Sequence, residues 1–409
     1  MSPTVRRLGP LLAAMYFIQG IGEPSDGLLA QPMMSLLRSW QRSPQEIATF
    51  SAALVLPWAL KPLYGLLVDS VPLFGSRRKS YLIASSLLST IGFAALYVYA
   101  PQEPAPWLLL ACLLVPALGV AFADVVIDAL MVEFGQPTGT TGQLQSIQWS
   151  AIYAAAIITS LAGGELSQRA MYRLPLLICA VFSGAMLWMA VRLVEPPAIA
   201  ATARTDQYHA APRGSAWPLL LVLGTFIFLW HFNPFCGAVL YLHLTSGLGL
   251  SESFVGTSNA IAAVTALAAC GLYAAYCRRL SARQLIHVSI GLGVIGTLCY
   301  AAVDGERSAC IAAALFGFAS TVATLAMLDL TAQVCPLAWA ATVFATMMAV
   351  ANLSMMLSTH LGGAMYQRLL EQCEARTAFA IVVATGAATT AACWLLVPML
   401  TRLGSTDVK

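Results

Sequence analysis

Long apolar runs recur from one end of the chain to the other, and they indicate an all-helical integral membrane protein. Of the 409 residues, 59% are hydrophobic and only 10% are charged, whereas soluble domains carry about 25% charged residues. A helix needs about 20 mostly apolar residues to cross a bilayer, and each run is at least that long. We predict twelve spans, near residues 9–37, 45–70, 79–100, 106–133, 142–168, 174–194, 217–245, 252–277, 283–303, 308–334, 337–367 and 377–401.

The longest polar connection, residues 195–216, follows the sixth span and divides the chain. We predict one six-helix bundle in residues 1–194 and a second in 217–409, joined by this connection as a cytoplasmic linker. With both termini cytoplasmic, 13 of the 21 Lys and Arg residues lie on the cytoplasmic side, 7 lie outside, and Lys61 lies within a span. Cytoplasmic loops carry an excess of Lys and Arg, so this orientation in the plasma membrane is the predicted one.

A short motif occurs twice, in the fifth and the eleventh span. Gly163–Arg169 and Gly362–Arg368 share the pattern G-G-x-x-x-Q-R at an offset of 199 residues, and Pro137 and Pro336 have the same offset. Two parallel six-span halves are typical of the major facilitator architecture, in which the substrate binds near the membrane midplane between the halves. We therefore predict a major facilitator fold.

A cation stands inside the second span, in the stretch Pro57–Tyr81. A lysine within a span costs roughly 2.5–3.5 kcal/mol on insertion scales, so Lys61 is a candidate functional residue. Downstream, a G-x-x-x-D pattern leads into a basic cluster, which is typical of a hinge on the cytoplasmic side. We assign Gly65, Asp69, Arg77 and Arg78 to this gate.

The fourth span carries three acids. Asp124 and Asp128 are one helical turn apart and share a face. Two close carboxylates resist joint ionisation, which is the property that a proton-coupling group needs. A structural alternative stays open for Asp128 and Glu133, because either acid could pair with Arg77 or Arg78 to lock the cytoplasmic side.

Two further spans contain a proline-linked break. The first span is interrupted at Gly20–Pro24, where Glu23 and Asp26 flank a proline that cannot donate a backbone hydrogen bond. Broken helices at membrane depth are tolerated where they line a cavity, so these acids either face the cavity or are solvated near its outer mouth. The seventh span has a similar break at Trp230–Phe235, where His231 either binds an anionic substrate or packs.

Isolated aromatic and polar side chains complete the candidate set. Trp58 and Trp149 either stack on a flat ring or pack, and Gln145 and Asn352 either face the substrate or bridge helices. Asp329 in the tenth span is assigned to the gate, with substrate contact as the alternative. The ten cysteines lie singly in apolar runs with no metal-ligand spacing, so we predict no metal, cofactor or catalytic residue.

Several stretches together resemble the folate–biopterin transporters, a branch of the major facilitator superfamily. The resemblance lies in Pro57–Tyr81, Ala123–Ala129, Gln143–Ser146, Phe226–Gly256 and Asn352–Ser354, and it extends over most of the chain. It implies a monomeric carrier in a bacterial inner membrane that takes up folates or pteridines with protons.

The resemblance also suggests roles for the charged residues. A carboxylate can accept the adjacent N–H and amine of a pterin, and we assign this role to Asp124. Lys61 would meet the carboxylates of a folate tail. The predicted substrate-binding residues are Lys61, Asp124, Trp58, Gln145, Trp149, His231 and Asn352; those for proton coupling are Asp124, Asp128, Glu23 and Asp26; those for the gate are Gly65, Asp69, Arg77, Arg78, Glu133 and Asp329.

Two alternatives remain open at this point. A major facilitator permease for a siderophore or a muropeptide would also carry an anionic, ring-bearing solute, and Lys61 would serve it equally. A remote alternative is an intramembrane enzyme in which Asp124 and Asp329 form a carboxylate dyad. The basic residues do not cluster into a nucleic-acid surface, so we expect no nucleic-acid partner.

Overall fold

The protein is almost entirely helical in the part of the chain that the structure describes. This computed structural model describes residues 3–76, 78–99, 105–135, 141–193, 216–276, 282–334 and 340–400. Within these ranges the non-helical segments are short, and the β pairing is one isolated bridge between Leu73 and Ser76. The predicted all-helical fold class is thereby confirmed.

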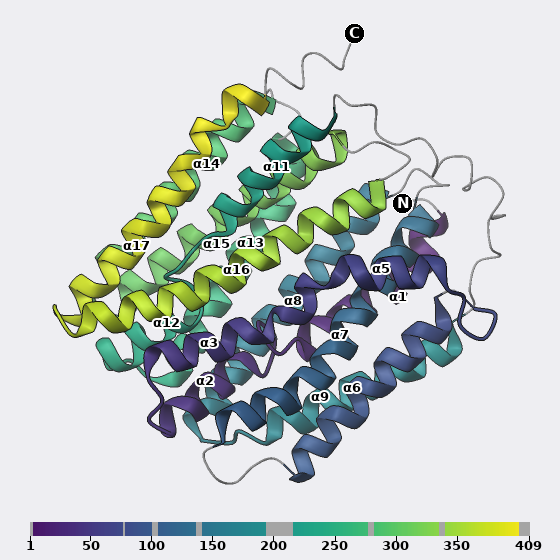
Figure 1. Ribbon diagram of the computed structural model, residues 1–409, viewed down its shortest axis with the longest axis horizontal. Helices are drawn as coiled ribbons and strands as arrows, with labels where there is room; N and C mark the ends of the chain where they lie inside the picture. Colours follow the sequence, from purple (N-terminus) through teal and green to yellow (C-terminus); the bar gives the residue numbers. More distant parts are fainter. Residues whose placement is uncertain are drawn as a thin grey trace.

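Helices α1 to α9, here called the N-terminal helices, lie side by side in one part of the molecule (Figure 1). They are α1 (Pro3–Gly22), α2 (Ala30–Ser39), α3 (Pro44–Leu54), α4 (Leu56–Ala59), α5 (Lys61–Ser70), α6 (Lys79–Tyr99), α7 (Pro106–Gly135), α8 (Thr141–Gln168) and α9 (Leu174–Arg192).

The remaining elements, the C-terminal helices, form the other part of the molecule (Figure 1). They are α11 (Ala216–His231), α12 (Ala238–Leu242), the π-helix η2 (His243–Gly247), α13 (Glu252–Tyr276), α14 (Ala282–Cys299), η3 (Tyr300–Ala302), α15 (Glu306–Val334), α16 (Ala340–Leu370), α17 (Ala375–Ala392) and η5 (Cys393–Leu395).

The two sets meet chiefly through two helix pairs, α8 with α13 and α3 with α16. The first and the last described helical segments begin and end, respectively, at one end of the molecule (Figure 1), here called the terminal end; we call the opposite end the distal end. The largest cluster of buried apolar side chains joins both sets there, with Leu37 and Phe50 from one set and Tyr241 and Phe379 from the other. The distal end is therefore closed. The predicted division at residues 195–216 stays a prediction, because nearly all of that segment lies outside the described residues.

Seven helices among the described residues are long and apolar enough to cross a membrane, and three shorter apolar helices accompany them. Helical segments cover every one of the predicted spans. The protein is therefore a multi-pass membrane protein, while the count of twelve spans stays a prediction.

Prolines divide three of the predicted spans. The breaks in the first and seventh spans are confirmed, since α1 ends at Gly22 before α2 begins, and α11 ends at His231 before α12 begins. The second span, predicted as one helix, is instead three segments, α3, α4 and α5. Pro57 and Pro62 stand in the first turns of α4 and α5, where a missing N–H is tolerated. The same residues would break the interior of a continuous helix.

A glycine contact between α6 and α7 tests this packing. A Cβ on Gly119 would lie 2.6 Å from the Ser85 carbonyl oxygen, whereas one on Gly291 of α14 would meet no heavy atom within 4 Å. We expect Gly119→Ala to lower the free energy of unfolding by about 1–3 kcal/mol, as overpacking does. Gly291→Ala should be neutral or stabilising, because alanine favours helix. Thermal unfolding in detergent measures both, and equal melting temperatures would contradict the packing described.

Candidate functional site

Lys61 and Asp124 form an ion pair between the N-terminal helices. Lys61 is the first residue of α5, and its Nζ pairs with Oδ2 of Asp124 on α7. The two side chains are 14% and 4% exposed. The two groups predicted to contact different parts of the cargo thus bind each other in this structure. A buried charge left without a partner is costly, so each compensates the other.

Asp128 lies one turn further along α7 and is held by two neutral donors. The Tyr16 hydroxyl of α1 donates to Asp128 Oδ1 at 2.8 Å, and the Gln148 amide of α8 donates to the same oxygen at 3.1 Å. Of the two acids for which a pair with Arg78 was the alternative, Glu133 makes that pair and Asp128 does not. Three helices therefore converge on one carboxylate close to Lys61.

A third acid reaches this centre from the break in the first span. Glu23 follows the end of α1 and interacts electrostatically with Lys61, as Asp128 also does. The Ser25 hydroxyl donates to Glu23 at 3.1 Å. Asp26 is exposed and interacts electrostatically with Glu23. We call Lys61, Glu23, Asp124 and Asp128 the central charge cluster.

The hinge residues meet at the terminal end. Arg78 donates to Asp69 Oδ1 at 2.8 Å and to Glu133 Oε1 at 2.9 Å, and its side chain is 5% exposed. It thereby ties the end of α5 to the end of α7. Gly65 has ordinary space around it, since a Cβ there would meet Val125 at 4.0 Å. Arg77 and the side chain of Asp329 lie outside the described residues.

The predicted aromatic and amide residues do not all join the central charge cluster. Trp58 is buried, and its carbonyl oxygen accepts a hydrogen bond from Asn352 Nδ2 of α16 at 3.3 Å. This bond links the two sets of helices. Trp149 is half-buried and lies 5.8 Å from the ring of Tyr153. Gln145 is half-buried at the start of α8.

His231 bonds within its own helix. Its Nδ1 lies 3.0 Å from the carbonyl oxygen of Ile227, one turn earlier in α11. The structure thus gives this histidine a structural partner at the break, and the role in binding an anion stays a prediction.

Two important residues were missed from the sequence. Tyr16 is a single tyrosine in an apolar run, and its partner Asp128 is distant in sequence. Glu252 begins α13 at the distal end and collects donors from both sets of helices. Tyr241 Oη donates to it at 2.6 Å and Arg38 Nη1 at 3.1 Å, while Gln31 Nε2 donates to its carbonyl oxygen at 2.7 Å. An acid in the first turn of a helix is common because it interacts favourably with the helix dipole. The sequence around Glu252 therefore did not indicate that other helices bond to it.

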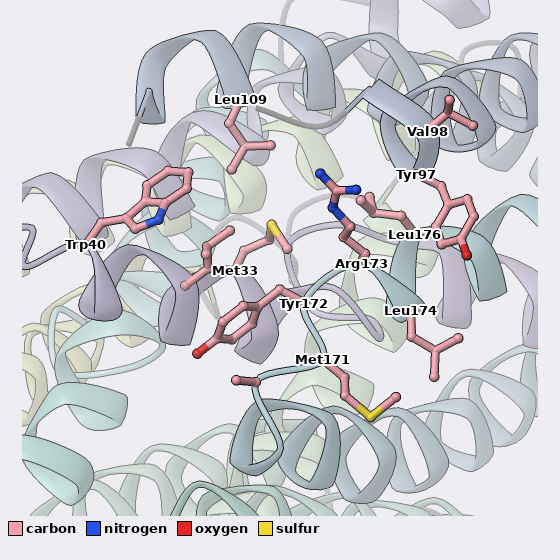
Figure 2. Close-up of a pocket in the computed structure, with 12 residues that line it drawn as sticks. Met33, Trp40, Tyr97, Val98, Leu109, Met171, Tyr172, Arg173, Leu174 and Leu176 are labelled. Atoms are coloured by element: carbon pink, nitrogen blue, oxygen red, sulfur yellow. The ribbon is translucent and has the colours of Figure 1, made fainter. Parts of the chain in front are cut away.

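A hollow of about 810 Å³ lies away from these residues, at the distal end of the N-terminal helices. Figure 2 shows Trp40, Tyr172, Tyr97 and Arg173 among apolar side chains on its wall. None of the predicted site residues lines it, so the central charge cluster and not this hollow is the candidate site.

Removal of Arg78 should destabilise the protein. Arg78→Ala removes a cation that pairs with both Asp69 and Glu133, and breaking a buried pair costs about 3–5 kcal/mol. Asp69 is partly exposed, so we expect the lower end of that range. Arg192→Ala is the control, because this exposed arginine lies over the ring of Trp188 and should change stability by less than about 0.5 kcal/mol. Chemical unfolding of both variants measures the difference; similar losses would contradict the role of Arg78.

Known proteins match this chain over most of its length. It matches the BT1 family over residues 19–403. The folate-biopterin transporter of Synechocystis sp. is 28% identical over 374 residues, which cover 86% of this chain and 73% of that protein. Folate transporter 2 of Plasmodium falciparum is 22% identical over 354 residues, which cover 83% of this chain and 77% of that protein.

Solved transporter structures share the fold at low identity. The D-xylose-proton symporter aligns with a TM-score of 0.71 and 15% identity, covering 95% of this chain and 97% of that one. The POT family transporter PepTSo aligns with a TM-score of 0.74 and 10% identity, covering 97% and 98%. The chain therefore belongs to the BT1 family and is a membrane transporter with the major facilitator fold, not an enzyme.

Proposed function

We propose that this transporter carries a folate- or pteridine-like organic anion together with protons, by alternating access between the two sets of helices. The observation that carries the proposal is the central charge cluster, in which a buried lysine is paired with an aspartate and stands near two further acids. The names of the relatives, folate-biopterin transporter and folate transporter, support this class of cargo.

The ion pair suggests how such a cargo is recognised. A carboxylate of the cargo takes the place of Asp124 on the Lys61 ammonium. Asp124 is then free to accept the adjacent N–H and amine of a pterin ring through charge-assisted hydrogen bonds. The Lys61–Asp124 pair is thus replaced by two pairs with the cargo, one at each residue. Neither buried charge is left unpaired, which would be costly.

The charge balance of the cluster supports coupling to protons. Three acids surround one lysine, so with all of them ionised the cluster is already negative before an anion arrives. Adding an anion to a poorly solvated negative site is unfavourable. Protons taken up by Asp128 or Glu23 remove that excess while Asp124 stays ionised for the cargo, and their release on the other side frees the cargo. Tyr16 and Gln148 hold Asp128 through neutral donors, which permit either protonation state.

The proposal includes the setting of the carrier. It acts as a monomer in a bacterial inner membrane with both termini cytoplasmic, as the excess of basic residues on that side supports. The Arg78 hinge then faces the cytoplasm, and the distal end faces outward.

The ion pair predicts a stability pattern in a double-variant experiment. Lys61→Met leaves Asp124 buried without a cation, and we expect a loss of about 3–5 kcal/mol. Lys61→Met with Asp124→Leu replaces the pair by apolar groups and should recover most of that loss, while transport stays abolished. Chemical unfolding and vesicle flux measure the two effects; a double variant no more stable than Lys61→Met would contradict the pairing.

Vesicle flux tests the cargo and the coupling. We expect an inward-directed proton gradient to accelerate uptake of folic acid and biopterin into vesicles that contain the purified protein. Asp124→Asn should reduce both fluxes about tenfold to a hundredfold, because a hydrogen bond to a charged group contributes about 1.5–3 kcal/mol. Lys61→Gln should impair folic acid more than biopterin, since only folic acid has tail carboxylates.

The control for this experiment is Glu165→Gln, an exposed acid of α8 whose partner is Arg169, directly after that helix, and its flux should match that of the unaltered protein. Flux that ignores the gradient would overturn the coupling. Thermal stabilisation by a siderophore and not by folic acid would overturn the cargo, because a ligand stabilises only the protein state that binds it.

A further inference from the structure

The repeated G-G-x-x-x-Q-R motif has no role in the central charge cluster. Its two copies, Gly163–Arg169 and Gly362–Arg368, lie in the last turns of α8 and α16 or directly after them. Both of these helices run toward the distal end (Figure 1). The copies are far apart in sequence, yet the second glycine and the glutamine make equivalent contacts in both copies.

The first glycine of each copy faces a broken helix of its own set. A Cβ on Gly163 would lie 3.5 Å from the carbonyl oxygen of Leu28, in the break between α1 and α2. A Cβ on Gly362 would collide with the carbonyl oxygen of Pro234, in the break between α11 and α12. Both first glycines therefore lie against a break; Gly362 leaves no room for a methyl group, whereas Gly163 has ordinary van der Waals space.

The second glycine of each copy faces the opposite set. A Cβ on Gly164 of α8 would lie 2.8 Å from the Cα of Gly256 on α13, and one on Gly363 of α16 would collide with the Cβ of Ala48 on α3. At these two crossings even a methyl group has no room. The second glycines therefore allow the two sets of helices to touch.

The glutamine of each copy bonds to the start of the same opposing helix. Gln168 Oε1 accepts the backbone N–H of Glu252, the first residue of α13, at 3.0 Å. Gln367 Oε1 accepts the backbone N–H of Gln45, in the first turn of α3, at 3.1 Å. The first N–H groups of a helix have no partner within that helix, so each glutamine caps a helix of the other set.

We infer that the repeated motif forms two symmetry-related clasps, Gly164–Gln168 on α13 and Gly363–Gln367 on α3, which hold the distal end closed and must both release when that end opens. Each clasp has an additional partner across the same boundary. Arg38 of α2 pairs with Glu252 at 3.1 Å, and Thr49 of α3 lies 2.9 Å from His360 of α16. The inference uses the transporter fold and does not depend on the cargo.

The clasps act on the balance between two states. Contacts made only in the closed state favour it, and their loss shifts the population toward the open state. A side chain larger than hydrogen at the second glycine acts in the same direction, because it cannot be accommodated while the helices touch.

The test measures the separation of the distal ends without any cargo. Spin labels at Ser39 of α2 and at Glu371, which follows α16, report the separation of the two sets by double electron–electron resonance in a cysteine-replaced background. Both positions are exposed. We expect the variant with both Gln168→Met and Gln367→Met to gain a longer-distance population, and Gly164→Val with Gly363→Val to gain a larger one.

Matched variants separate the clasps from general damage. Gln367→Glu keeps an acceptor oxygen and should stay closed, and so should Arg169→Ala, which removes only the next residue of the motif. Labels at Glu306 and Glu371, both within the C-terminal helices, should keep their distance in every variant. An unchanged Ser39–Glu371 distance in the folded double-methionine variant would overturn the inference, as would equal opening by Arg169→Ala.

Discussion

The buried pair of Lys61 and Asp124 is the interaction on which the interior of this protein depends. Neither charge is tolerable alone among apolar helices, so α5 and α7 must approach each other at this point. The break of the second span at Leu60 makes this possible, because it sets Lys61 at the beginning of a new helix instead of within a continuous one. Backbone geometry and charge compensation thus support each other.

Prolines at the breaks give the transporter its irregular interior. The end of α1 puts Glu23 near Lys61, and the end of α11 leaves His231 bonded to its own helix. The two breaks are similar in sequence and differ in chemistry, since acids follow the first and aromatic residues surround the second. The charged centre therefore lies within the N-terminal helices, and Asn352 of the C-terminal helices contacts the adjacent segment α4 through the Trp58 carbonyl oxygen.

Much of the fold could be predicted from the sequence, because apolar length decides where helices cross a membrane and proline decides where they break. Arg78 lies close in sequence to its partner Asp69, and for that reason the hinge could be predicted from the sequence. Contacts between helices that are distant in sequence could not be predicted. A helix that is apolar on nearly every face does not show which face points inward, so the bonds from Tyr16 to Asp128 and from Tyr241 to Glu252 required coordinates. The sequence also did not show that Trp58 and Lys61 would lie in two separate helices, α4 and α5, because two prolines within one span can break it in more than one way.

The crossings at Gly164 and Gly363 have a consequence for the independence of the two halves. Each half supplies one glutamine and one helix start, and each glutamine accepts a hydrogen bond from the helix start of the other half. Neither half contains both partners of either bond, although each contains a complete copy of the motif. The closed distal end therefore depends on both halves together, because each half bonds to the other through one glutamine.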